Sequence, residues 1–152
     1  MKIGVLADSH DNLPMLRKAM ALFATEGVDT VVHAGDFIAP FAVKELLRFE
    51  GTVLAVFGNN DGEQKGIRKL GLDVTEPPRR VELGGRTVLL SHAPPEDPGP
   101  VDVIVSGHTH EVQVETGPPL RLNPGECGGW LSGRCTVALL DTDTLAVEIK
   151  EL

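Results

Sequence analysis

The chain is poor in the residues that would tie it to an oxidising compartment or to a membrane. Its 152 residues include two cysteines, one tryptophan and no tyrosine. Cys127 and Cys135 lie outside any C-x-x-C metal spacing, so we expect two unpaired thiols rather than a disulfide. The apolar residues 1–7 lack the length and cleavage pattern of a signal peptide. No later apolar run approaches the ~20 residues of a membrane span. These features predict a cytoplasmic protein.

Positive charge is scarce as well. Lys and Arg number 14 against 22 Asp and Glu, which gives a formal net charge of -8. Long nucleic acid is therefore a poor partner, because its binding relies on clustered Lys and Arg. An anionic substrate would need positive charge from bound divalent metal ions, which are often the largest local charges in a site.

The rest of the composition is that of an ordinary globular protein, with 41% hydrophobic and 24% charged residues. The length is typical of a single domain with one sizeable hydrophobic core. We therefore expect a single domain over residues 1–152.

Short apolar runs alternate with helical patterns in the first half of the chain. Strands are predicted at 2–7, 30–33 and 52–57, with helices at about 13–26 and 40–48 and a weaker helical stretch at 62–70. Further strands are predicted at 80–83, 86–91, 102–106, 112–115, 135–141 and 145–151. This order indicates an α/β (α+β) fold with a parallel or mixed sheet.

Residues that commonly bind metals follow the predicted strands at their carboxyl ends. In chain order they are Asp8 and His10, Asp36, Asn59, His92, and His108 and His110. In open α/β sheets ligands bind in the crevice at the carboxyl ends of the strands, so these loops should converge on one place.

The residue types indicate which ions would bind. Imidazole, carboxylate and carboxamide oxygen together suit Mn, Fe, Co, Ni or Zn, whereas Ca and Mg prefer shells of oxygen alone. Seven candidate ligands are too many for one tetrahedral ion, but they suffice for two ions if one carboxylate bridges. Two ions about 3.5–4 Å apart can clamp the attacking and leaving oxygens of an in-line displacement.

Five short motifs carry a resemblance to a known family. They are D-x-H at 8–10, G-D at 35–36, G-N-x-D at 58–61, a lone histidine at 92 and G-H-x-H at 107–110. In this order they resemble the motifs of the calcineurin-like metallophosphoesterases. The small size and the G-N-N-D variant are most similar to the compact YfcE-type bacterial and archaeal phosphodiesterases. One motif alone would be weak evidence, because an Asp at a strand end is usually a turn former or a helix cap.

The resemblance implies a role for each candidate ligand. One metal ion would be bound by Asp8, His10 and His110 and the other by Asn59, His92 and His108, with Asp36 as the bridge. The implied fold is a four-layer α/β/β/α sandwich of two mixed sheets. The implied cofactors are two divalent transition metal ions, Mn ahead of Ni, Co, Fe or Zn. The implied activity is hydrolysis of a small phosphate ester, a diester ahead of a monoester, by direct attack of a metal-bridging hydroxide.

Asn60 is a departure from the family pattern, because larger phosphatases of this family have a histidine at that position. A carboxamide can donate a hydrogen bond but cannot deliver a proton. We therefore expect Asn60 to be a hydrogen-bond donor on the substrate side, and good leaving groups such as nitrophenolate to be cleaved far better than alkoxides. The close spacing of the motifs leaves no room for a cap domain, which indicates an open site.

Several alternatives stay open at this point. His33, the fifth histidine, is expected to support the site or pack in the core rather than bind a metal. The same fold could serve as a non-catalytic metal-binding or protein-interaction scaffold, or as a small-nucleotide phosphatase or nuclease. Retention of every ligand type favours the enzyme. The oligomeric state is undetermined, a homo-oligomer included.

Overall fold

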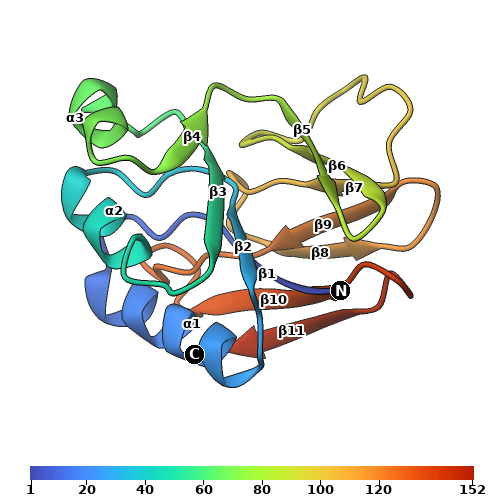
Figure 1. The fold of residues 1–152 in the computed structure, drawn as a ribbon, viewed down its shortest axis with the longest axis horizontal. Helices are drawn as coiled ribbons and strands as arrows, with labels where there is room; N and C mark the ends of the chain where they lie inside the picture. Colours follow the sequence, from blue (N-terminus) through green and yellow to red (C-terminus); the bar gives the residue numbers. More distant parts are fainter.

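The computed structural model describes residues 1–152 and consists of two β-sheets packed face to face, with three helices on one outer side (Figure 1). The strand order is β11-β10-β1-β2-β3-β4 in the six-stranded sheet and β5-β6-β7-β9-β8 in the five-stranded sheet. Each sheet contains both parallel and antiparallel pairs. The expected sandwich of two mixed sheets is therefore confirmed.

The strands of the six-stranded sheet are β1 (Lys2–Leu6), β2 (Thr30–His33), β3 (Thr52–Val56), β4 (Asp73–Thr75), β10 (Thr136–Asp141) and β11 (Val147–Glu151). Those of the five-stranded sheet are β5 (Arg79–Leu83), β6 (Arg86–Leu90), β7 (Val103–Val105), β8 (Val112–Glu115) and β9 (Leu120–Pro124). The helices are α1 (Leu13–Thr25), α2 (Pro40–Leu46) and α3 (Gln64–Lys69). None of the three helices has both the length and the apolar character needed to cross a bilayer.

Alternation along the buried strands creates two separate cores. In β2, Val31 faces the helices, where it joins a cluster that includes Phe23 of α1. The next residue, Val32, faces the second sheet and joins a cluster with Val88 and Val103. Because successive side chains of a strand point to opposite faces, a strand covered on both sides reads as a continuous apolar run. This explains why the central strands were predicted well from hydrophobicity alone.

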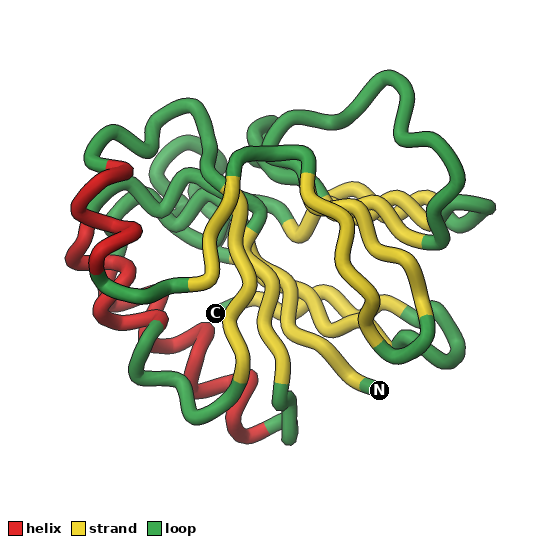
Figure 2. The backbone as a smooth tube through the Cα atoms, turned by 45° about the horizontal axis from the view of Figure 1, so that its top comes forward, coloured by secondary structure: helices red, strands yellow, loops and turns green.

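The helices cover only the six-stranded sheet, and this differs from the four layers implied by the family resemblance (Figure 2). The parallel crossover from β6 to β7 contains four prolines between residues 93 and 100, and proline disrupts a helix interior. The Arg80 guanidinium donates hydrogen bonds to the carbonyl oxygens of Pro98 at 2.6 Å and Pro100 at 3.0 Å. The crossover is thus a loop held by hydrogen bonds from Arg80. In a four-layer sandwich a helix would lie at this position.

Two strands, β4 and β9, were not predicted. Strand β4 has only three residues, and β9 is preceded by Gly117, Pro118 and Pro119 and ends on Pro124. Proline and glycine normally mark turns, so this stretch reads as a loop. The strand expected from 145 begins at Val147, because Leu145 adopts a φ of +59° in the preceding turn. Both cysteines are free, as expected.

Candidate metal centre

The predicted site residues come together at one end of the sandwich, where the loops after β1, β2, β3, β6 and β7 meet. The strands β1, β2 and β3 are parallel, as are β6 and β7, so their carboxyl ends lie on the same side of each sheet. Asp36 lies between the contributions of the two sheets: its Oδ2 is 3.6 Å from His10 Nε2 and 3.4 Å from His92 Nε2. All seven candidate ligands are linked by contacts of this kind, as described below.

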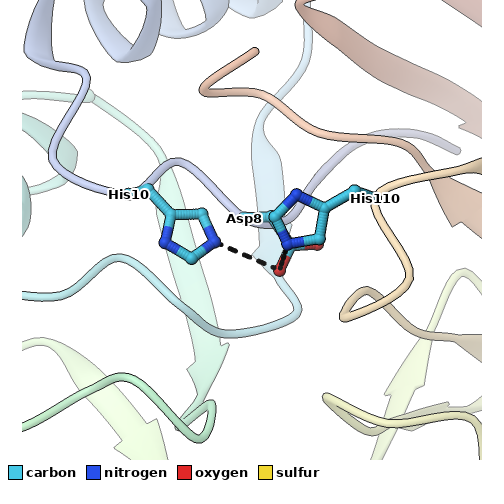
Figure 3. Close-up of side chains that lie close together, drawn as sticks. All are labelled: Asp8, His10 and His110. Carbon is cyan, nitrogen blue, oxygen red and sulfur yellow. Dashed lines mark ion pairs between the residues drawn. The ribbon is translucent and has the colours of Figure 1, made fainter. Parts of the chain in front are cut away.

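Asp8, His10 and His110 form the first cluster, which we call the Asp8 group. Asp8 Oδ1 is 3.8 Å from His10 Nε2 and 3.7 Å from His110 Nε2, and the two rings approach it from different loops (Figure 3). Both Asp8 Oδ1 and His10 Nε2 are buried without a hydrogen-bond partner. Ligand atoms about 2.0–2.2 Å from one ion lie roughly 3–4 Å apart. The spacing and the missing partners both fit a divalent ion.

Asn59, His92 and His108 form the second cluster, the Asn59 group. Asn59 Oδ1 lies 2.9 Å from His92 Nε2 and 3.0 Å from His108 Nδ1, and these two nitrogens are 3.3 Å apart. His92 Nδ1 lies 2.9 Å from the carbonyl oxygen of Ala34. A carbonyl only accepts, so Nδ1 carries the proton and neutral His92 presents a lone pair at Nε2. That lone pair faces the oxygens of Asn59 and Asp36, which is an arrangement that a cation would stabilise.

Asp36 carries negative charge between the two groups. Its side chain is almost fully buried, and it accepts hydrogen bonds from the Asn60 backbone N–H at 2.8 Å and from Asn60 Nδ2 at 2.7 Å. Burial alone would raise the pKa of this carboxyl, but the contacts from His92 and Asn60 outweigh burial and hold the pKa well below its usual range. The site therefore keeps an ionised carboxylate at its centre.

The carboxylates draw positive charge to the imidazoles. The pKa of His10 is raised, chiefly by its interaction with Asp8 against the effect of burial. For His92, burial lowers the pKa, but the contacts with Asp36 and with the Ala34 carbonyl raise it further than burial lowers it. A divalent ion would satisfy this electrostatic demand in place of protons.

The backbone of the site is strained. Positive φ angles occur at five of the seven candidate ligands, namely Asp8 (51°), His10 (44°), Asp36 (58°), His108 (69°) and His110 (62°). Such conformations are uncommon outside glycine and cost about 1–3 kcal/mol each. Strain of this kind concentrates at functional sites, where the surrounding fold enforces it.

Two glycines of the motifs, Gly58 and Gly107, are required for steric reasons. A Cβ added at Gly58 would collide with the Asp36 carboxylate, and one at Gly107 would lie 2.7 Å from Asp8 Oδ2. The glycine in each of these motifs therefore makes room for the ligand of another motif. This explains why a glycine precedes the ligand in G-N and G-H.

Two acidic residues hold the ligand loops in place, and neither was assigned a role from the sequence. The Asp61 carboxylate accepts backbone hydrogen bonds from Gly58 at 2.7 Å, Asp36 at 3.0 Å and Ile38 at 2.6 Å. The fully buried Glu126 places Oε1 3.2 Å from His110 Nδ1. A carboxylate behind a metal-ligating histidine orients the ring and raises its basicity. Asp61 belongs to a recognised motif, whereas Glu126 has no motif to mark it.

His33 lies in the core rather than among the ligands. Its Nδ1 accepts a hydrogen bond from the Gly35 N–H at 3.2 Å, and its Nε2 lies 3.0 Å from Ser9 Oγ. Complete burial lowers the pKa of His33 to about 3, so the ring is neutral. Both ring nitrogens are engaged, which agrees with the supporting role expected for this residue.

A groove of about 600 Å³ between α1 and α2 contains none of the candidate ligands. Its main polar groups pair with one another: Glu45 accepts from Arg17 at 2.9 Å and from Arg48 at 2.7 Å. Of the four buried polar atoms without a hydrogen-bond partner, three belong to the Asp8 group and none lies in this groove. The chemistry of the chain is therefore not expected in the groove.

Comparison with known proteins agrees with this geometry. The model of the calcineurin-like phosphoesterase superfamily domain matches residues 1–145. Phosphodiesterase MJ0936 of Methanocaldococcus jannaschii is 38% identical over 156 residues, with 94% of each chain covered. Phosphodiesterase YfcE of Escherichia coli is 31% identical over 168 residues, which cover 97% of this chain and 91% of YfcE. The solved structure of an archaeal phosphodiesterase superimposes with a TM-score of 0.90 at 34% identity over 100% of both chains.

Proposed function

The chain belongs to the calcineurin-like phosphoesterase superfamily, and we propose that it is a phosphodiesterase that binds two divalent metal ions at the Asp8 and Asn59 groups. The observation that carries this proposal is the convergence of lone pairs on two points. Asp8 Oδ1 and His10 Nε2 are buried without partners at one, and at the other Asn59 Oδ1 and Asp36 Oδ2 face His92 Nε2. Two divalent cations would satisfy both points at once.

Each group would hold one ion, and Asp36 would contact both. When bound, the two ions would supply positive charge for a phosphate ester and lower the pKa of a coordinated water to about 7. Glu126 would keep the His110 ring oriented, and Asp61 would fix the backbone on both sides of Asp36. The protein thus contributes geometry and a buried negative charge, while the ions contribute the charge that attracts the substrate.

The substrate side has few groups of its own. Asn60 is exposed and uses one N–H of its amide for Asp36, so a second N–H remains for an oxygen of the substrate. No group in this position can donate a proton to a poor leaving group. A small phosphodiester with a good leaving group is therefore the substrate we propose, in line with the activity named for MJ0936 and YfcE. Mn as the preferred ion and the cytoplasm as the location remain predictions from the sequence.

The test is hydrolysis of bis-p-nitrophenyl phosphate and p-nitrophenyl phosphate by metal-stripped protein, with Mn, Ni, Co, Zn or Mg added back one at a time. We expect turnover that depends on the metal and is faster for the diester. Asp36→Asn should abolish turnover, whereas Asp29→Asn, an exposed carboxylate outside the site, removes the same charge and should leave turnover unchanged. Protein that is folded but inactive with every metal would support the scaffold function instead.

A further inference from the structure

Trp130 is the only tryptophan of the chain and lies on the surface beside the Asp8 group. Its residue is 65% exposed, although tryptophan is highly buried on average. The indole Nε1 donates a hydrogen bond to the backbone carbonyl oxygen of His10 at 3.1 Å. The polar atom of the ring is thus engaged, and the exposed area belongs mainly to its apolar carbons.

The buried carboxylate of Glu126 holds the loop that carries Trp130. The Glu126 carboxylate accepts hydrogen bonds from the backbone N–H groups of Trp130 at 2.8 Å, Leu131 at 3.1 Å and Ser132 at 2.8 Å, and from Ser132 Oγ at 2.7 Å. This is the same carboxylate that lies 3.2 Å from His110 Nδ1. One buried carboxylate therefore lies within ion-pair distance of a candidate metal ligand and also holds the backbone of the aromatic residue.

The start of the same loop is bonded to the loop of Asp8. The Gly128 N–H donates to the Asp8 carbonyl at 3.0 Å, and Asn12 Nδ2 donates to the Gly128 carbonyl at 2.7 Å. With the indole bond to His10, three hydrogen bonds connect the loop of Trp130 to residues 8–12. Its ring is placed in advance of any ligand, so binding to it would cost little ordering.

The hydrogen bond of the indole N–H to His10 accounts for the position of the ring but not for the exposure of its carbons. A tryptophan that only stabilised the loop would be expected to bury its carbons. Contiguous exposed apolar side chains, unlike single scattered ones, mark binding surfaces. Leu131 follows Trp130 and is 80% exposed. Two consecutive residues of this loop thus expose large apolar side chains, and the first of them is bonded to the His10 backbone.

We propose that Trp130 is the substrate subsite for a nucleobase, so that the phosphodiester bound at the metal centre is a nucleoside ester. This inference rests on the proposed function, since the metal centre would bind the phosphate and Trp130 the base. Every base has a π-face that can stack on an aromatic side chain, and no hydrogen-bond readout is needed.

The surroundings favour a planar, uncharged group over an ionic one. Residues 126–133 include no Lys or Arg, and the next basic side chain, Arg134, pairs with Glu151 at 2.9 Å. The backbone N–H groups of Trp130, Leu131 and Ser132 are already used by Glu126. What residues 126–133 offer a ligand is therefore the ring face of Trp130.

The kinetic test compares two diesters with the same leaving group: the p-nitrophenyl ester of thymidine monophosphate and methyl p-nitrophenyl phosphate. The wild-type protein should prefer the nucleoside ester, and Trp130→Ala should reduce that preference in kcat/KM about tenfold, mainly through KM. Trp130→Phe keeps a ring face and should retain most of the preference. Leu47→Ala removes another exposed apolar side chain, at the far end of α2, and should leave the preference unchanged.

The second measurement does not depend on turnover. Because the chain has one tryptophan and no tyrosine, its tryptophan fluorescence reports on Trp130 alone. Thymidine monophosphate should change this fluorescence saturably, and inorganic phosphate at the same concentration should not.

Metal-dependent hydrolysis with no nucleoside preference and no fluorescence response to the nucleotide would overturn the subsite and leave the proposed function standing. A saturable fluorescence response in folded protein that hydrolyses neither diester would support the subsite and overturn the proposed function. The failures of the two proposals are thus distinguishable.

Discussion

The Asp8 group and the Asn59 group differ in how far the protein itself satisfies them. In the Asp8 group, Asp8 Oδ1 and His10 Nε2 are buried and have no partner. In the Asn59 group, Asn59 and His108 are exposed to solvent and contact each other at 3.0 Å. A buried polar atom without a partner costs about 1–3 kcal/mol, whereas an exposed one can be hydrated. The Asp8 group therefore destabilises the metal-free fold more than the Asn59 group does.

Asp8→Asn gives the largest contrast between activity and stability. We expect turnover to fall about 10³-fold, because a ligand to one of the ions is weakened. In metal-free protein at alkaline pH, where His10 is deprotonated and cannot pair with Asp8, the variant should be more stable by about 1 kcal/mol. The reason is that an amide oxygen can still accept from the His108 N–H, while the amide N–H groups face the nitrogens of His10 and His110. Turnover assays and urea unfolding of the metal-free variant check the two effects.

Asp36→Asn is the matched comparison. It removes the same charge, but its amide would present an N–H group either to Asn60 Nδ2 or to the Asn60 backbone N–H, both of which now donate to Asp36. The metal-free protein should therefore lose stability where Asp8→Asn gains it. Equal stability changes in the two variants would mean that the unpartnered atoms of the Asp8 group do not destabilise the metal-free protein.

Glu126→Gln should act on the Asp8 group alone. An oriented carboxylate behind a ligating histidine contributes about 10–100-fold to metal affinity, and Glu126 is close to His110 but makes no contact with the Asn59 group. A two-step metal titration should show one weakened step and one unchanged step. The metal-free protein should also be destabilised, since an amide cannot accept all the hydrogen bonds from the loop of residues 130–132. Equal weakening of both steps would mean that the groups bind as one unit.

The convergence of the candidate ligands was predictable because each of them follows a strand that hydrophobicity identifies. Parallel strands place their carboxyl ends on one side, so the alternation of apolar runs and ligand residues already indicates convergence. For Asp36 and His92 the only signals in the sequence were the predicted strand before each residue and the short motif that contains it.

The part that could not be predicted lies after β9. Proline and glycine on both sides conceal that strand, and without it nothing places Glu126 next to His110 or Trp130 next to His10. The family resemblance also implied a layer of helices over the five-stranded sheet. This chain has no helix there, because the crossover from β6 to β7 is rich in proline. Local propensity identifies regular elements, whereas long-range contacts between loops depend on how those elements pack.

His33 links the loop of Asp8 and His10 to the loop of Asp36, through Ser9 and Gly35, and gives a pH-dependent prediction. Its folded-state pKa of about 3 lies below the value of about 6.5 in an unfolded chain. As the pH falls below 6.5, the unfolded state binds a proton that the folded state does not, so the free energy of unfolding decreases.

His33→Gln stays neutral and can keep the contacts with Ser9 and Gly35. Between pH 7 and pH 5 the wild type should lose about 2 kcal/mol more than the variant, measured by urea unfolding of metal-free protein. Parallel stability curves would show that His33 titrates normally.

Asn60→Ala should have the smallest effect, and its dependence on the leaving group carries the information. Loss of the 2.7 Å hydrogen bond to Asp36 Oδ2 should cost about 1 kcal/mol, or roughly fivefold in turnover of nitrophenyl esters, whose leaving oxygen needs no donor. Alkyl esters should lose more, because the second N–H of the amide is the only donor proposed for their leaving oxygen. Turnover of a series of diesters with leaving groups of increasing pKa tests this. A loss that is equal across the series would mean that Asn60 acts only by holding Asp36 between the two groups.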